Sequence, residues 1–295
     1  MLKSIDGRVA VLCAVLLQAA GKVSYGTWLI AVPSTLFVLV SFTLAAVMFA
    51  VTSGRTIGQR SFGWILLLNV STAVTFLAFF QALKLIEPAI VAAIEIGVTP
   101  PLALLVGYLL QRTRPNRTQG IVCTGILIGC FMLAAAAHTG SGLSGSGQNA
   151  SLGIAANIIA GAGAVAITVA SKALMERRWS RGAILAHRIY LIIPVAFLFT
   201  MYTPIDPVVK TFPIMGFIVA IAVLGVVLPL YLLQIGIERT DAYTVLSTMA
   251  ALPVFTFLLE AFSPVYQLSW LTAAGITVIT ATLLFGASES KRDKH

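Results

Sequence analysis

The sequence predicts an all-α integral membrane protein with ten transmembrane helices, arranged as two inverted five-helix repeats. Three observations support this prediction: the hydrophobic composition, the length of the apolar runs and a weak internal repeat. Of the 295 residues, 59% are hydrophobic and only 10% are charged, whereas a typical soluble domain has about 25% charged residues. Such a chain cannot cover its apolar surface in water, so a lipid bilayer is its expected environment.

The apolar runs are about twenty residues long, as a helix needs to cross a hydrocarbon core about 30 Å thick. The first five predicted spans are Arg8–Thr27, Pro33–Thr52, Phe62–Leu83, Pro88–Leu110 and Gln119–Ala137. The next five are Leu152–Leu174, Gly182–Tyr202, Pro213–Ile235, Ala242–Phe262 and Leu268–Gly286. Between the two sets lies the chain's Gly/Ser-rich stretch, typical of a flexible linker. We therefore expect a first repeat at 9–136, a linker at 137–152, a second repeat at 153–286 and a tail at 287–295.

The basic residues predict the orientation of the chain. The formal net charge is +9, but the Lys and Arg residues lie between apolar runs and form no single basic face, which argues against nucleic-acid binding. If the N-terminus is cytoplasmic, 14 of the 19 Lys and Arg residues fall in cytoplasmic segments. Lys22, Lys172 and Arg188 lie within or at the edge of spans, and only Lys84 and Lys210 lie in outer loops, as the positive-inside rule requires. Both termini are therefore expected in the cytoplasm, in a multi-pass protein of the cell (inner or plasma) membrane. A cleaved signal peptide is the alternative for the first run, and it would leave nine spans.

The two halves share a sparse set of identical residues in the same order. In the first helix of each half, Ala14, Val15, Ala20 and Lys22 match Ala164, Val165, Ala170 and Lys172, and further along Gln81, Ala89, Pro100 and Leu105 match Gln234, Ala242, Pro253 and Leu258. Because each unit has an odd number of spans, the two copies enter the membrane in opposite orientations. Inverted repeats of this kind are typical of secondary transporters.

The same residues resemble the drug/metabolite transporter superfamily, in its ten-helix EamA-like branch. The resemblance covers one unit from about Val9 to Ala136 and another from about Gly153 to Gly286. In the second unit, Asp241 to Pro253 followed by Glu260 is similar to the family pattern of a mid-helix Pro and a Glu seven residues later. In the first unit, Pro88 and Pro100 fit, but Gly107 stands where the Glu would be. The resemblance implies a solute carrier for amino acids, toxins, metabolites, metallophores or nucleotide sugars.

Glu95 is the main candidate for a substrate-binding residue. It lies in the outer half of the fourth predicted span among Ile and Val residues, where a carboxylate costs roughly 2.5 to 3.5 kcal/mol and should face the bundle interior or an aqueous cavity. It can bind a substrate ammonium group or exchange a proton, and a structural ion pair is the alternative. Lys22 is the expected partner because it lies at a similar depth in the first span, although a Lys near a helix end can also snorkel to the interface.

Other polar residues extend this candidate site. Arg188, within the seventh span, is a candidate for binding an anionic group, with snorkelling or helix pairing as the alternative. Gln81, Gln234 and Tyr231 either line a cavity or tie helices together by hydrogen bonds. We expect Glu260, near the outer end of the ninth span, to be a solvated boundary residue. Pro100 and Pro253 each remove a backbone hydrogen bond at matching places in the two halves, which predicts kinks that act as hinges next to a site in mid-membrane.

Together these features predict a secondary transporter that exports a small amino-acid-like metabolite, zwitterionic or anionic, by alternating access. The alternative within this class is efflux of hydrophobic drugs or toxins. An intramembrane lipid-modifying enzyme is the alternative from another class, but His138, His187 and His295 are scattered. No nucleotide-binding loop, metal-ligand cluster or nucleophile constellation is present, so we expect neither catalysis nor a cofactor. The expected partners are a small-molecule solute and the lipid bilayer, and the sequence leaves open whether the protein is a monomer or a homodimer.

Overall fold

A computed structural model describes residues 6–52, 57–59, 61–112, 116–139, 149–240 and 242–292. Within these ranges the chain forms helices and connecting loops without strands, which confirms the predicted all-helical class. Most of the predicted Gly/Ser-rich linker, Asp241 of the family-like motif and the last three residues of the tail lie outside the described residues.

The first half forms five uninterrupted helices. Local sequence explains where several of them begin: the Asp6 side chain accepts the Arg8 N–H, Pro88 occupies the first turn of its helix, and Asn116 forms a reciprocal capping box with Gln119, so that exposed N–H groups find partners. The helices are α1 (Gly7–Trp28), α2 (Ser34–Thr52), α3 (Phe62–Ala82), α4 (Pro88–Gln111) and α5 (Arg117–His138).

The helices of the second half are interrupted more often. This half contains α6 (Ala150–Glu176), α7 (Arg181–His187), α8 (Ile192–Tyr202), the 3-10 turn η3 (Pro207–Lys210), α9 (Phe212–Ala222), the π-helical turn η4 (Val223–Val227), α10 (Leu228–Arg239), α11 (Ala242–Met249), α12 (Leu252–Glu260) and α13 (Trp270–Arg292). Three predicted spans thus contain an irregularity.

Each irregularity has an identifiable cause. Pro229 offers no N–H to the Gly225 carbonyl, and the Leu228 N–H bonds instead to Val223, which produces the π-helical turn. The predicted span Ala242–Phe262 is divided for a similar reason, in agreement with the kink predicted at Pro253. Pro253 interrupts the ladder, α11 ends at Met249, and the Thr280 hydroxyl donates to the carbonyl of Ala250 in the gap.

Asn69 closes the gap between α7 and α8. Its side-chain amide donates to the His187 carbonyl, and its oxygen accepts the Leu191 N–H. These two bonds replace backbone partners that the interrupted helix has lost, so the break is satisfied inside the bundle, as the absence of water in a hydrocarbon core demands.

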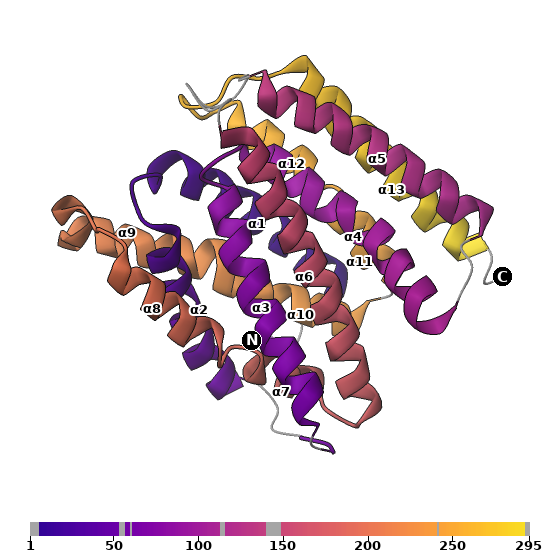
Figure 1. The fold of residues 1–295 in the computed structure, drawn as a ribbon, viewed down its shortest axis with the longest axis horizontal. Coiled ribbons are helices and arrows are strands. Elements are labelled where there is room, and N and C mark those ends of the chain that lie inside the picture. The colour runs from indigo at the N-terminus through magenta and orange to yellow at the C-terminus, as the bar shows by residue number, and fades with distance from the viewer. Residues whose placement is uncertain are drawn as a thin grey trace.

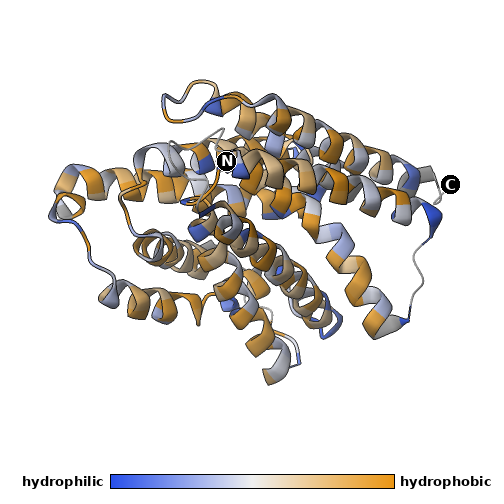
Figure 2. Ribbon diagram, turned by 45° about the horizontal axis from the view of Figure 1, so that its top comes forward, coloured by the Kyte–Doolittle hydropathy of each residue, from blue (hydrophilic) through white to orange (hydrophobic). Residues whose placement is uncertain are grey.

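The described residues contain nine helices that are long and apolar enough to cross a membrane, with Ser247–Glu260 as a shorter apolar helix. The ninth of the ten predicted spans is therefore the short, interrupted one. Hydrophobic residues predominate along the helices (Figure 2), in agreement with a multi-pass membrane protein.

In the bundle, α4 lies at the centre, in contact with both α6 and α12. The pair α5 and α13 runs side by side along one edge, and α2, α8 and α9 form the opposite side (Figure 1). The helix α3 packs along α6, while α1 packs against α10 and α12. Gly163 of α6 faces Thr75 of α3 so closely that an added Cβ would overlap the hydroxyl, in agreement with the close helix packing expected of small residues.

A close backbone approach joins α1 to η4. A Cβ added at Gly21 would overlap the Cα of Gly225, and one added at Gly225 would lie 2.7 Å from the Cα of Gly21. Backbone atoms cannot move aside as a flexible side chain does, so only glycine fits on both helices.

We expect Gly21→Ala to separate α1 from η4 and to destabilise the protein by about 1 to 3 kcal/mol, the usual cost of overpacking. Gly216→Ala is the matched control, because nothing lies within 4 Å of the Cβ position at this residue of α9. Thermal unfolding of the detergent-purified protein measures both. Equal melting temperatures for the two variants would contradict the close approach.

Candidate functional site

A buried ion pair joins the two central helices α1 and α4. Lys22 Nζ lies 2.6 Å from Glu95 Oε2, and it also lies 4.4 Å from the centroid of the Phe79 ring. The Lys22 side chain is 7% exposed, whereas that of Glu95 is 28% exposed. The two residues are thus in contact, as expected for partners, and Lys22 is buried against α4 and Phe79. The carboxylate is the more accessible member of the pair.

The exposed side of Glu95 faces a cavity of about 780 Å³. The cavity extends from Gln18, Glu95 and Thr99 to Asn116 at the start of α5 and Glu289 near the end of α13. Its walls are mainly apolar and include Ile96, Ala103, Leu104, Val122, Met249, Leu252 and Leu283. Glu95 and Glu289 are the charged residues among those that line it, and both are acidic.

The remaining predicted site residues do not line this cavity. Gln81 accepts a hydrogen bond of 2.9 Å from the Ser34 hydroxyl, a contact between α2 and α3. Tyr231 packs at the edge of the main hydrophobic core, and Gln234 lies one turn further along α10. Of the predicted set, the structure brings together Lys22, Glu95 and Pro100, which lines the cavity.

Arg188 lies apart from this cavity, at the C-terminal end of α7. Its guanidinium carbon is 5.6 Å from the centroid of the Phe76 ring. Among the described residues, Arg188 therefore contacts an aromatic ring and not a carboxylate. The predicted grouping of Lys22, Glu95 and Arg188 in one site is therefore not what the fold produces.

The two prolines have different surroundings. Pro100 and Pro101 lie inside α4, which continues through both. Pro253 lies in the first turn of α12, directly after Leu252, a residue of the cavity wall. The interruption of the helix at Pro253 thus lies beside the cavity.

Glu260 is not the solvated boundary residue that the sequence suggests. It is 1% exposed, and its Oε1 accepts the Ala89 N–H at 2.7 Å, in the first turn of α4. Glu87, the residue before α4, is also buried, at 4% exposure. Glu87 lies in the turn between α3 and α4, where the sequence predicts contact with water. The start of α13 reaches this turn, because the Thr272 hydroxyl lies beside the Glu87 carboxyl.

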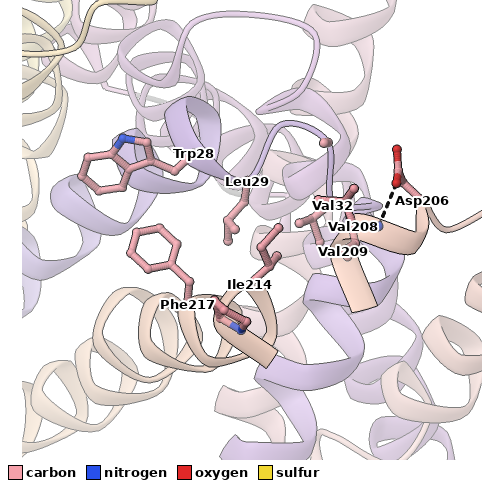
Figure 3. Close-up of a pocket in the computed structure, with 10 residues that line it drawn as sticks. Trp28, Leu29, Val32, Asp206, Val208, Val209, Ile214 and Phe217 are labelled. Carbon is pink, nitrogen blue, oxygen red and sulfur yellow. Dashed lines mark hydrogen bonds between the residues drawn. The ribbon is translucent and has the colours of Figure 1, made fainter. Parts of the chain in front are cut away.

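A second, smaller cavity of about 430 Å³ lies between the α1–α2 turn and α9 (Figure 3). The rings of Trp28 and Phe217 pack edge to face in its lining, with centroids 5.6 Å apart. Its acidic residue, Asp206, already accepts the Val208 N–H at 2.8 Å as the cap of η3. The cavity at Glu95 is therefore the stronger candidate for a solute site.

Charged residues inside an apolar helical bundle, beside a cavity, mark a candidate site for a solute or an ion. Residues 151–286 match the model of the EamA-like transporter family. This match covers the second of the two units that resemble the drug/metabolite transporter superfamily in sequence. The second half of the chain is thus similar to a family of membrane transporters.

Comparison of the fold supports the same architecture over the whole chain. Twenty-five chains of solved structures match. One of them, titled "Crystal structure of protein", has a TM-score of 0.66 and 18% identity, and the alignment covers 98% of this chain and 99% of the other. At that identity the match establishes the fold alone. No curated protein sequence matches the chain.

The ion pair yields a prediction about stability. Removal of one partner from a buried pair costs roughly 3 to 5 kcal/mol, because the other charge is left uncompensated. We therefore expect Lys22→Met and Glu95→Gln each to lower the melting temperature more than the double variant does. A double-mutant cycle from thermal unfolding in detergent measures this coupling, and additive effects would contradict a direct interaction.

Proposed function

We propose that the protein is a secondary transporter that moves a small amine-bearing metabolite, such as an amino-acid-like zwitterion, by alternating access. The observation that carries this proposal is the accessible carboxylate of Glu95 at the end of the large cavity. An ammonium group can take the place of Lys22 beside Glu95, and Lys22 is then available to a substrate carboxylate. The acidic lining of the cavity favours the amine of such a zwitterion over a purely anionic solute.

The direction of transport follows from the orientation that the basic residues predict. The cavity opens at the end of the bundle where α4 ends, α5 begins and α13 ends. Arg112 and Arg117 lie at this end, as do Arg177, Arg178 and Arg181 between α6 and α7, which supports a cytoplasmic location. A cavity open to the cytoplasm supports loading from inside, and hence export across the cell (inner or plasma) membrane.

The proposed inverted repeat has support from the pattern of helix contacts. The contact of α3 with α6 corresponds, after exchange of the halves, to that of the α9–α10 helix with α1. The contact of α4 with α6 corresponds likewise to that of α12 with α1. Such exchange is what a pseudo-two-fold axis in the membrane plane requires, and rocking of the halves about it would move access from one end to the other.

Efflux of lipophilic amines is the second candidate. The apolar walls of the cavity favour it, because they accept a hydrocarbon body and leave only Glu95 to pair with the charged nitrogen. Both candidates depend on the same carboxylate, and they differ in whether a substrate carboxylate contributes to binding.

The test begins with metabolite profiles of cells and medium with and without the gene, followed by uptake of the solute that changes into proteoliposomes. We expect Glu95→Gln to raise the apparent Kd about tenfold or more, since a charged hydrogen bond contributes about 1.5 to 3 kcal/mol. Glu176→Gln is the matched control, because this exposed carboxylate at the end of α6 lies outside the cavity. Unchanged uptake in Glu95→Gln would refute the role of this residue.

Thermal-shift measurements separate the substrate classes. A ligand that binds only the folded protein stabilises it in proportion to the logarithm of its concentration over Kd. We expect a shift with an amino acid and none with its N-acetyl derivative, which lacks the ammonium group. A shift with the decarboxylated amine as large as with the amino acid favours the lipophilic-amine candidate, and a shift with the N-acetyl derivative alone would contradict both.

A further inference from the structure

Two buried carboxyl groups lie at the closed end of the bundle, opposite the mouth of the large cavity. Glu87 belongs to the turn between α3 and α4, and Glu260 ends α12. Both are almost fully buried, at 4% and 1% exposure, and they are near enough for their charges to interact. One carboxyl therefore comes from each half of the chain.

A backbone N–H contacts one of the two carboxyls at this place, and no positively charged side chain among the described residues pairs with either. The Ala89 N–H donates to Glu260 Oε1 from the first turn of α4, and the N-terminal end of a helix stabilises a negative charge. Neither carboxyl forms a salt bridge among the described residues. Two like charges in so dry a place cannot both be ionised without strong repulsion.

Two hydroxyl groups point to a ligand held between the carboxyls. The hydroxyls of Tyr266 and Thr272 are buried here and make no hydrogen bond of good geometry in the described part of the chain. The Thr272 hydroxyl nevertheless lies close enough to the Glu87 carboxyl to lower its pKa. The Tyr266 hydroxyl lies close enough to Glu87 and Glu260 for both charges to act on it. These unused donors and acceptors surround a site that a shared proton would complete.

The same residues hold the end of the bundle closed. The Thr27 hydroxyl lies 3.0 Å from that of Ser263, which joins α1 to the loop after α12. Gly26 lies against the Tyr266 hydroxyl, where a Cβ would overlap it. Together with the bond between Glu260 and Ala89, these contacts fasten α12 and its following loop onto α1 and α4.

The nearby titratable groups do not supply a counter-charge. Lys22 is bound to Glu95 deeper in the bundle. Lys84 lies in the same turn as Glu87, and burial alone lowers its pKa, without an effect from either carboxylate. In the halves of the packed elements that lie toward this end, the other titratable side chains are Lys22 and Tyr25 of α1, Lys84 of the turn, Glu95 of α4 and Tyr266 of the loop.

We propose that Glu87 and Glu260 form a proton-binding site that locks this end of the transporter while the cavity is open at the other. In the closed end the pair holds one proton. When the O–H bond breaks and the proton leaves to the buffer, the two carboxylates repel each other and α12 separates from α4. The inference rests on the proposed alternating access, and it adds a pH-dependent gate to it.

The direction of the pH effect follows from the acid that is buried. Burial raises the pKa of Glu87 to about 7, and the Thr272 hydroxyl offsets this by a smaller amount. The pair therefore holds at least one proton at and below this pH, and the closed end loses stability as the pH rises above it. For a single proton, the ratio of open to closed molecules rises by up to about tenfold per pH unit.

The test measures this end of the bundle without any substrate. Spin labels are placed at Ala261→Cys, after α12, and at Leu152→Cys, at the start of α6 beside the α3–α4 turn, after Cys13, Cys123 and Cys130 are replaced. Double electron–electron resonance in lipid nanodiscs then gives the distance distribution from pH 5 to pH 9, with the pH range taken as about two units on either side of the Glu87 pKa. We expect a longer distance to gain population as the pH rises.

Matched variants decide the assignment. Glu87→Gln and Glu260→Gln each leave a single charge, and in the second the amide oxygen still accepts the Ala89 N–H, so both variants should stay closed at every pH. Glu176→Gln should behave like the parent. A distance that is independent of pH in the parent, or that still follows pH in both Gln variants, would overturn the proposal. If the longer distance follows Na⁺ concentration at fixed pH, the site binds a metal cation and the proton assignment is wrong.

Failure of this gate and failure of the proposed function are distinguishable. The parent protein is also assayed for uptake in proteoliposomes. If uptake occurs while the label distance ignores pH, the gate proposal is refuted and the transporter stands. Because a Gln variant that fails to fold gives no label data, the infrared absorption of a protonated carboxyl in the parent is the second measurement, and its absence below pH 6, about one unit under the Glu87 pKa, also refutes the proposal.

Discussion

The attraction between Lys22 and Glu95 is the interaction on which the centre of this bundle depends. A helix in a bilayer satisfies its own backbone, so helices associate chiefly through packing and a few polar contacts. This pair joins α1 to the central helix α4, at the end of the large cavity. Since each charge compensates the other, the contact contributes to the stability of the empty protein. Under the proposed function it also sets a chemical requirement on the solute, which must offer at least as good a partner to one of the two charges.

The carboxyl pair Glu87 and Glu260, at the opposite end, differs from the ion pair in its charges. There, two like groups are buried together, and the contact with the Ala89 N–H stabilises one of the two charges. The bundle therefore combines an opposite-charge pair beside its open cavity with a like-charge pair at its closed end. Both pairs involve α4 or the turn that leads into it. This helix therefore lies between the candidate solute site at Glu95 and the proposed proton-binding site at Glu87 and Glu260.

Much of the architecture is readable from hydropathy and charge, because a bilayer imposes a fixed length on every span. The uninterrupted helices α1 to α6 agree with the predicted spans within a few residues. The contact of Lys22 with Glu95 is also foreseeable, since both must hide their charges at similar depth. The π-helical turn and the division of α11 from α12 are harder to predict, because a proline shows where a hydrogen bond is lost but not how the helix accommodates the loss.

The site is less predictable than the fold. Gln81, Tyr231 and Arg188 look like cavity residues in the sequence, but whether a polar residue faces a cavity or a neighbouring helix depends on the rotation of its helix. Glu87 and Glu260 are missed for the converse reason. Both lie at helix ends, where water is expected, and only the loop from Ser263 to Ser269 and the start of α13 cover them.

The Asn69 bridge has a mechanical consequence for the second half. Because one side chain bonds to both ends of the interrupted α7–α8 helix, bending at that break would lose two hydrogen bonds in an environment without water to replace them. The break between α7 and α8 is therefore expected to resist bending. In the gap between α11 and α12, the Ala251 N–H bonds to the Thr248 carbonyl, and the side-chain bond to a neighbouring helix is the longer one from Thr280, at 3.3 Å. If the halves move as proposed, bending would therefore cost less at this gap, next to Leu252 of the cavity wall, than at the α7–α8 break.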